Sequence, residues 1–171
     1  MRHSLFGALL VLGLAAPAAA QSVLDPPPVT RSIDLSGPRF GLTMLSQGVV
    51  DRLRERAIDV RPAISQFGWQ FERQFYRRDS GVAALNEWIV LFGGLEQDVV
   101  IPSFTWMVGL RSRDGLELGI GPNVTPGGVA LAMAAGVTVR AGVVNVPVNV
   151  AVVPSKVGTR VSILTGFNMR R

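Results

Sequence analysis

The sequence predicts an all-β protein, an antiparallel up-and-down barrel of about eight strands with one short amphipathic helix. Two observations predict this fold class. First, bulky apolar residues alternate with small or polar ones over most of the chain after residue 39, and a period of two is typical of strands whose two faces differ. Second, turn-forming sequences separate these runs and leave no room for a long helix.

The alternation is most visible over 66–76, where Phe67, Trp69 and Phe71 stand between glutamine, glycine and glutamate. Most of the runs have one bulky apolar face and one small or polar face. The exception is 84–92, which is apolar on both faces around Glu87. Eight is the smallest number of strands that closes a membrane barrel. The predicted strands are 40–45, 66–76, 84–92, 103–111, 116–120, 129–140, 144–152 and 160–169.

The segment 46–59 interrupts this pattern. Val49, Val50 and Leu53 fall on one side of a helical wheel, and the charged residues fall elsewhere, which predicts an amphipathic helix. We expect it to cover one mouth of the barrel. The alternative is a helix that lies at a membrane interface.

The N-terminus has the features of a secretory signal peptide over 1–20. A basic start precedes an apolar stretch, and small residues lead to a predicted cleavage site after Ala20. The stretch is shorter than the roughly 20 apolar residues that a spanning helix needs. Residues 21–38 contain three consecutive prolines and are predicted to form an extended tether, which leaves 39–169 as the barrel domain.

Several kinds of chemistry are excluded by composition. The chain has no cysteine, and its one histidine, His3, lies in the predicted leader. The exported chain therefore lacks the groups for a Ser-His-Asp or Cys-His nucleophile and for the common zinc sites. We expect no enzymatic activity, no catalytic residue, no cofactor and no metal. Its basic residues are scattered rather than gathered in a stripe, so nucleic acid is not an expected partner.

The two strand faces allow two arrangements. The chain is 48% hydrophobic and 17% charged, against roughly 25% charged in average soluble domains. The apolar face points outward to lipid in a membrane barrel and inward in a soluble one. The opposite face is mostly Gly, Ala, Ser, Asn and Gln, which suits a narrow lumen better than a water-exposed coat. Pro147, inside a predicted strand, argues against a closed barrel because it lacks a backbone donor.

The soluble alternative places the bulky aromatic side chains inside, where they would hold an apolar small ligand. Its location would be periplasmic or secreted. The residues concerned are Phe67, Trp69, Phe71, Phe104 and Trp106.

Four charged residues lie on the polar faces at a similar depth in their strands. They are Glu72, Arg111, Glu117 and Arg140. Because buried charges must be paired and hydrogen-bonded, we interpret them as a possible ion network in the lumen. The alternative, equally compatible with the sequence, is that they are surface charges near turns.

The leader, the strand number and the alternation over most of 39–169 together resemble those of small outer-membrane β-barrel proteins of Gram-negative bacteria. The resemblance is one of pattern and includes no specific motif. It implies insertion into the outer membrane, contact with its lipid, no cofactor, and a role in structure, adhesion or binding. A wide pore is not expected, because small barrels fill their interior with side chains.

Overall fold

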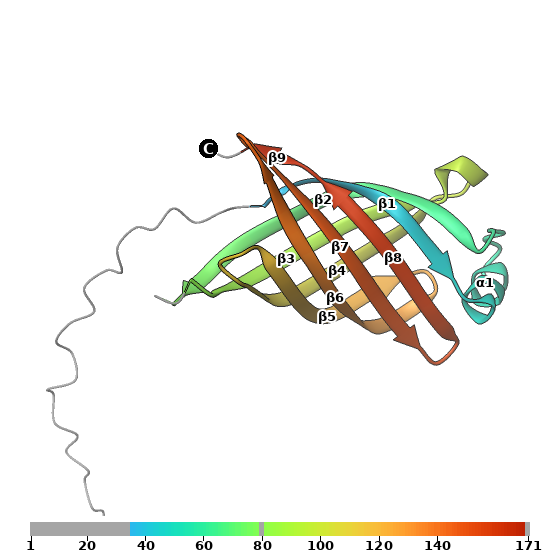
Figure 1. Cartoon of the computed structure of the whole chain (residues 1–171). Helices are drawn as coiled ribbons and strands as arrows, with labels where there is room; N and C mark the ends of the chain where they lie inside the picture. The colour runs from blue at the N-terminus through green and yellow to red at the C-terminus, as the bar shows by residue number, and fades with distance from the viewer. Residues whose placement is uncertain (1–34, 79–80, 170–171) are drawn as a thin grey trace, which may run out of the picture. The chain divides into compact units, whose positions relative to one another are not determined.

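The computed structural model describes residues 35–78 and 81–169. The predicted leader and most of the predicted tether lie outside these ranges. The described chain forms a closed antiparallel β-barrel with one α-helix (Figure 1), which confirms the predicted fold class. The elements are β1 (Gly37–Leu45), α1 (Gln47–Arg54), β2 (Ala63–Arg77), β3 (Ala83–Gly93), the 3₁₀ turn η2 (Leu95–Gln97), β4 (Ile101–Arg111), β5 (Leu116–Thr125), β6 (Gly128–Ala141), β7 (Val144–Ser155), β8 (Gly158–Gly166) and β9 (Asn168–Met169).

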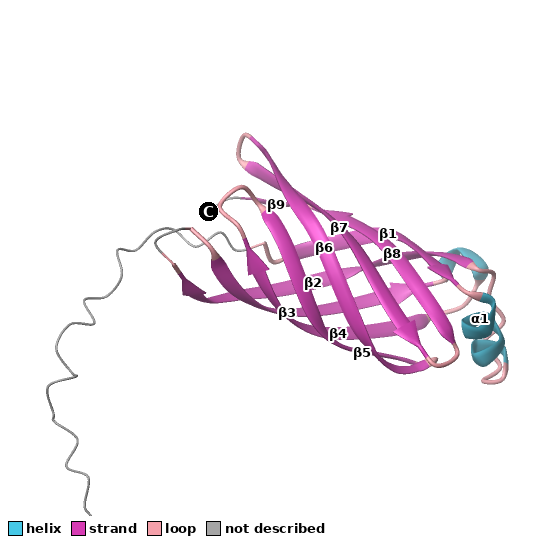
Figure 2. Ribbon diagram, turned by 60° about the horizontal axis from the view of Figure 1, so that its bottom comes forward, coloured by secondary structure: helices cyan, strands magenta, loops and turns pink. Residues whose placement is uncertain are grey.

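The strands follow an up-and-down order. Each of β1 to β7 pairs with the next strand along the chain, and the pairing of β1 with β8 closes the barrel. The two-residue β9 follows β8 and pairs with the start of β7. Both views show the strands strongly tilted around the barrel (Figures 1 and 2), as closure of a small sheet requires.

The two ends of the barrel differ in their connections. At one end, called here the terminal end, β1 begins, β9 lies and the β2–β3, β4–β5 and β6–β7 turns are short. The β6–β7 hairpin turns at Gly142, whose φ of +60° suits the primed turns of two-residue hairpins. The opposite end, the α1 end, carries the longer connections 46–62 and 94–100 (Figure 2).

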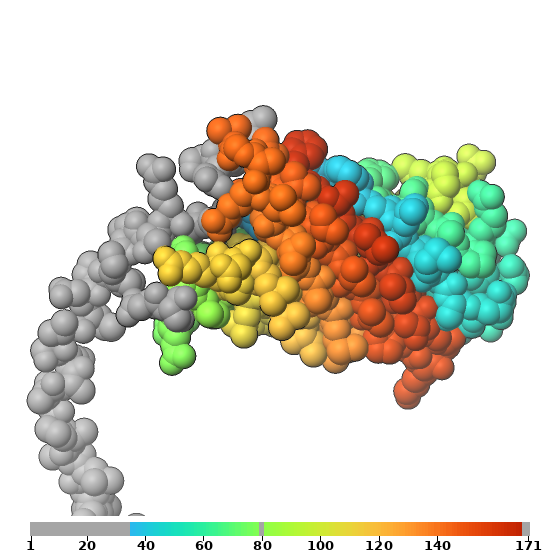
Figure 3. All heavy atoms as spheres, in the orientation of Figure 1, coloured from blue at the N-terminus to red at the C-terminus, as the bar shows by residue number. Residues whose placement is uncertain are grey.

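The barrel is inverted relative to a soluble protein. Exposed large hydrophobic side chains outnumber buried hydrophobic residues by about two to one in the described ranges. Phe71, Trp106 and Val148 are 51%, 42% and 38% exposed, whereas the alternate positions point into the lumen. Figure 3 shows the outer side chains of neighbouring strands forming one continuous wall. The apolar strand faces therefore point outward, as the alternation favoured.

This orientation corrects one part of the soluble alternative, the aromatic core. All five aromatic residues that it placed inside lie on the outer surface, and each of them is 42–51% exposed. The reason is their strand phase: they alternate with Gln66, Gln70 and Ser103, which are buried. A core built from these aromatic rings is therefore wrong.

Pro147 is accommodated by a break in the sheet. The β7–β8 register begins at Val148 with Thr165, and the β7–β9 register takes up Val144 and Asn145. The ladder on this side thus passes over Pro147, whose own carbonyl accepts a hydrogen bond from Thr165 Oγ1 at 3.0 Å. A proline is tolerated in this closed barrel because the last strand is interrupted beside it.

The helix is shorter than the predicted 46–59. It ends at Arg54 because the next residues form a Schellman-type cap, in which the Ile58 N–H donates to the Leu53 carbonyl at 3.0 Å. Ala57, with φ of +60°, takes the left-handed position that glycine usually occupies. Ile58 packs against the same cluster as Leu53. The segment after the helix then returns across the barrel mouth to β2.

The α1 end is closed by an apolar cluster. Val49, Val50 and Leu53 of α1 are buried against residues from the strand ends and the loop before β2, in agreement with the predicted capping role. The strand-end and loop members are Leu45, Val60, Ile64 and Ile101.

The β3–β4 connection is fastened at the same end. The Glu96 carboxylate accepts hydrogen bonds from the Ser65 hydroxyl and from the Ser65 N–H, the latter at 2.9 Å. The hydroxyl hydrogen bond is the larger cause that lowers the pKa of Glu96 to about 2. The carboxylate is therefore charged at neutral pH and holds η2 against β2.

The cap predicts a clear contrast between two leucines at this end. Leu53→Ala removes a buried side chain, and we expect it to lower the free energy of unfolding by about 2–5 kcal/mol. Leu95→Ala, at an exposed leucine of η2, is the matched control and should change it by less than about 0.5 kcal/mol. Denaturant unfolding of the two variants measures the difference, and equal losses would contradict the capping role of α1.

Candidate functional site

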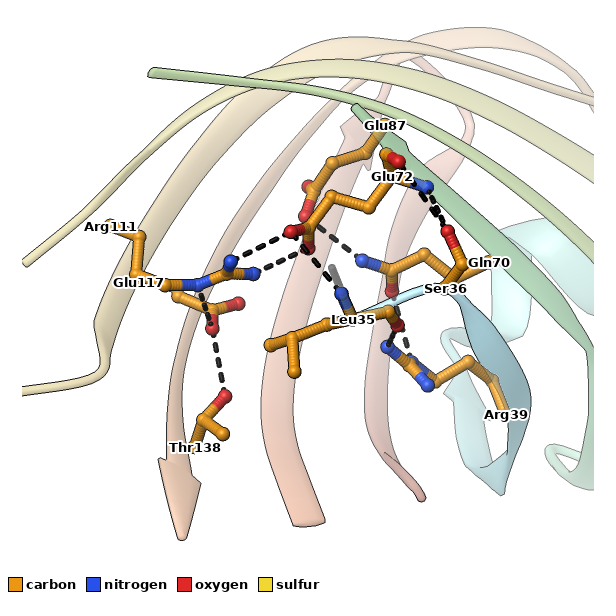
Figure 4. Close-up of polar contacts among 9 residues, drawn as sticks. All are labelled: Leu35, Ser36, Arg39, Gln70, Glu72, Glu87, Arg111, Glu117 and Thr138. Carbon is orange, nitrogen blue, oxygen red and sulfur yellow. Dashed lines mark hydrogen bonds and ion pairs between the residues drawn. The ribbon is translucent and has the colours of Figure 1, made fainter. Parts of the chain in front are cut away.

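Charged side chains gather in the lumen near the terminal end. Three of the four residues singled out in the sequence meet there, where Arg111 contacts both Glu72 and Glu117 (Figure 4). They come from β2, β4 and β5 and are buried. A guanidinium between two carboxylates satisfies the requirement that buried charges be paired.

Arg111 is the centre of this arrangement. Its Nη1 donates to Glu72 Oε1 at 2.7 Å, and its Nη2 contacts Glu72 Oε2, so the pair is bidentate. Its Nε donates to Glu117 Oε1 at 2.7 Å. Glu117 Oε1 also accepts from Thr138 Oγ1 of β6 at 2.8 Å. Bidentate contacts fix the plane of the guanidinium and are among the strongest hydrogen bonds in proteins.

The register explains why these residues meet. Arg111 and Glu117 are direct cross-strand partners in the β4–β5 pair, and Glu72 faces Glu87 in the β2–β3 pair. Like charges directly opposite each other repel. The Arg111 guanidinium, which binds Glu72, and the Gln70 amide, which donates to Glu87 Oε1 at 2.9 Å, relieve that repulsion.

A second arginine, not among the predicted site residues, extends the cluster to β1. Arg39 is 1% exposed. Its Nε donates to Gln70 Oε1 at 3.0 Å, and its Nη2 donates to the Leu35 carbonyl at 2.7 Å. Leu35 in turn donates its N–H to Glu72 Oε1 at 3.3 Å. Figure 4 shows the two arginines on opposite sides of the glutamates.

These additional residues carried a partial signal in the sequence. Gln70 and Glu72 lie on the same polar face of β2, and Glu87 is the one charge in an apolar strand. Arg39 lay just before the predicted first strand, 40–45, whereas β1 begins at Gly37. An inward phase for Arg39 follows only from this earlier start.

Arg140 does not join the cluster. Its side chain is exposed, and its Nη2 donates to the Arg113 carbonyl at 3.4 Å. It lies two residues beyond Thr138 on the same face of β6, which brings it to the mouth at the terminal end rather than to the depth of Arg111. The four-residue network expected from the sequence is therefore three of those residues together with Arg39, Gln70, Glu87 and Thr138.

A cavity of about 70 Å³ lies in the lumen, lined by residues of all eight barrel strands. Glu87 and Gln70 of the charged cluster line it, and so does Arg160 near the start of β8. Its wall is apolar at Leu91, Met107 and other positions, and hydroxyl and amide groups are interspersed. The further lining residues are Thr43, Gln66, Ile89, Ser103, Thr105, Asn123, Ala132, Ala134, Asn149, Ala151, Val153, Ser162 and Leu164.

The cluster is suited to joining strands and filling the lumen. In the part of the chain that the structure describes, no three His, Cys, Asp or Glu residues are placed to hold a metal ion. Arg111 and Glu72 are bound to each other, which ties β2 to β4 across the intervening β3.

Among the described helices, none has the length and hydropathy needed to cross a membrane.

The cluster predicts unequal costs for two glutamate substitutions. Glu72→Gln leaves the buried Arg111 with one carboxylate fewer, and we expect it to lower the free energy of unfolding by about 3–5 kcal/mol. Glu55→Gln breaks the exposed ion pair with Arg52 and should cost less than about 1 kcal/mol. Urea titrations of both variants measure the two values, and a small loss for Glu72→Gln would show that Arg111 is satisfied without it.

Comparison with known proteins gives no relative from which a function could be inferred. No family model, no curated protein and no solved structure matches the chain. The proposals below therefore rest on the geometry and chemistry of the chain itself.

Proposed function

We propose that this protein is an exported, non-enzymatic β-barrel of the bacterial outer membrane, with a structural or binding role and no wide pore. The observation that carries the proposal is the continuous apolar outer surface of the barrel, combined with a polar, hydrogen-bonded lumen. A barrel with an apolar outside and a polar inside is stable in lipid, because a transmembrane barrel exposes apolar side chains and satisfies its backbone groups between strands.

The distribution of outward charges supports lipid contact. The outward-facing positions of the described strands carry one charged residue, Arg73. It lies toward the terminal end of β2. A β-bulge at Gln74/Tyr76 turns both Phe75 and Tyr76 outward near it. Aromatic and arginine side chains at that level suit the boundary between hydrocarbon and headgroups.

A second aromatic group lies toward the α1 end of the same wall. Phe67 and Phe92 are cross-strand partners with ring centroids 6.0 Å apart, and Phe104 follows on β4. Trp69, Phe71 and Trp106 lie on the outer face between this group and Phe75, so outward aromatic side chains continue along β2 to β4. Such a wall suits contact with hydrocarbon and with its boundary regions.

The connections support an orientation. Outer-membrane barrels have short periplasmic turns and longer extracellular loops. We infer that the terminal end, with its short turns, faces the periplasm and that α1 and η2 lie outside. With this orientation, β1 begins on the periplasmic side.

The lumen supports a closed barrel over a pore. The charged cluster fills it near the terminal end and the apolar cluster under α1 fills the other end. Small barrels of this strand number fill their interior in the same way. The absence of cysteine, and of histidine after the leader, favours a binding or structural role over catalysis.

Fractionation of expressing cells tests the location. We expect the protein in the detergent-soluble envelope, with different gel mobility before and after boiling, because a closed barrel resists unfolding by detergent until it is heated. A native, detergent-free protein in the osmotic-shock fluid would contradict the membrane proposal. A band at the size of the uncleaved chain would contradict the leader.

A pair of valine substitutions tests lipid contact directly. Val150 points outward near the middle of β7, and Val157 lies in the exposed β7–β8 turn. We expect Val150→Arg to lower the free energy of unfolding from lipid vesicles by about 2–4 kcal/mol and Val157→Arg to lower it by about 0–1 kcal/mol. Guanidinium unfolding followed by tryptophan fluorescence measures both. Equal effects would mean that Val150 does not face hydrocarbon.

A further inference from the structure

The lumen cavity contains a cation without a carboxylate partner. Arg160 points into it from β8, and its Nη1 donates to Thr125 Oγ1 at 2.8 Å. No ion pair joins Arg160 to any acidic residue within the described ranges. A half-buried guanidinium with unused N–H groups is a recognition site for a carboxylate, whose geometry it matches.

An unpartnered amide atom faces the same cavity. Asn123 is 4% exposed, and its Nδ2 donates to Ser103 Oγ at 2.9 Å and to Thr105 Oγ1 at 2.7 Å. Its Oδ1 is buried without a hydrogen-bond partner. Exchanging the amide oxygen and nitrogen would leave the nitrogen unpartnered instead, so one polar atom faces the cavity in either orientation. A hydroxyl group, which both donates and accepts, satisfies either one.

The remaining wall defines the size and polarity of an occupant. A cavity of 70 Å³ accommodates about five water molecules at 10–15 Å³ each, or a molecule with a similar number of heavy atoms. Leu91, Met107 and Val153 supply an apolar surface for a short carbon chain. Glu87, in the half of β3 nearer the terminal end, also lines the cavity, and its carboxyl group disfavours an occupant with a second acidic group.

We propose that this cavity binds a small hydroxylated monocarboxylate, with its carboxylate on the Arg160 guanidinium and its hydroxyl on the Asn123 amide. This binding function goes beyond the proposed membrane location and does not depend on it, because the cavity is internal to the barrel.

The β6–β7 seam gives the occupant a route of entry. The register between these strands begins at Met133 with Val152, so the first residues of β6 and the last residues of β7 have no partner across the seam. Ala132 and Val153, which flank this unpaired stretch, line the cavity. Separation of the seam here breaks no ladder hydrogen bonds between the two strands.

Three probes of nearly equal size separate the interactions: lactate, propionate without the hydroxyl, and lactamide without the charge. The full exported chain, labelled with [¹³C-methyl]methionine, reports binding by NMR. Met107 lies inside the barrel, and Met44 and Met133 are exposed on its outer face. We expect lactate to shift the Met107 methyl signal saturably and to leave the Met44 and Met133 signals unchanged. Propionate should bind several-fold more weakly, and lactamide at least about tenfold more weakly.

Two substitutions in the same region provide a matched comparison. Arg160→Gln should weaken lactate binding at least about tenfold, whereas Lys156→Gln, in the neighbouring exposed turn, should change it less than about twofold. Asn123→Val should remove the preference for lactate over propionate. Heat-dependent gel mobility checks that each variant folds, and the probe series on the unsubstituted chain requires no variant.

Three results would overturn the proposal: no shift of Met107 with lactate, equal binding of lactamide, or unchanged lactate affinity in a folded Arg160→Gln variant. The membrane proposal is decided separately by fractionation. Were the chain found in the soluble fraction, the same titration in buffer without detergent would still decide whether the cavity binds a carboxylate.

Discussion

The structure depends on one constraint: with bulky apolar side chains outside, every polar group in the narrow lumen must find its partner among the inward residues of other strands. The cluster around Arg111 meets this constraint near the terminal end. Arg39, Gln70, Glu72, Glu87, Glu117 and Thr138 complete it, so hydrogen bonds and ion pairs connect six of the eight barrel strands. Removing one member leaves charges that have no access to bulk water, which is why the cost of a single substitution is large.

The two ends of the lumen are closed by different physical means. Near the terminal end the closure is ionic and directional, because Arg111 and Glu72 meet in one bidentate geometry. At the α1 end it is apolar and less directional, because Val50 and Leu53 pack onto strand ends. Replacing a buried ion pair with apolar side chains of similar volume is often neutral or stabilising, whereas removing one partner is strongly destabilising. The ionic end therefore depends on all of its partners being present, and the apolar end depends on the area that it buries.

The sequence predicted the strands well because period-two alternation records both the strand and its two faces. It predicted Glu72, Arg111 and Glu117 as one group because each lies on a polar face near the same end of its strand. It did not predict Arg39, whose inward direction depends on where β1 begins, or the separation of Arg140, which depends on strand register. The helix was predicted too long because Ala57 carries no glycine signal for a left-handed cap. Pro147 argued against a closed barrel because a break in the last strand is a tertiary feature.

The small residues of the lumen connect these observations to function. Ala132, Ala134 and Ala151 border the cavity, and a barrel built solely to close could fill it with larger side chains at these positions, as small barrels commonly do. The same cavity retains Arg160 without a carboxylate and Asn123 with an unpartnered atom, and each costs free energy unless a molecule in the cavity supplies its hydrogen bonds. Apolar replacements would remove both costs while leaving the two end closures intact. A centre that is open, charged and unsatisfied between two well-packed ends is therefore the part of this barrel that closure alone does not explain, and a polar occupant supplies the missing interactions.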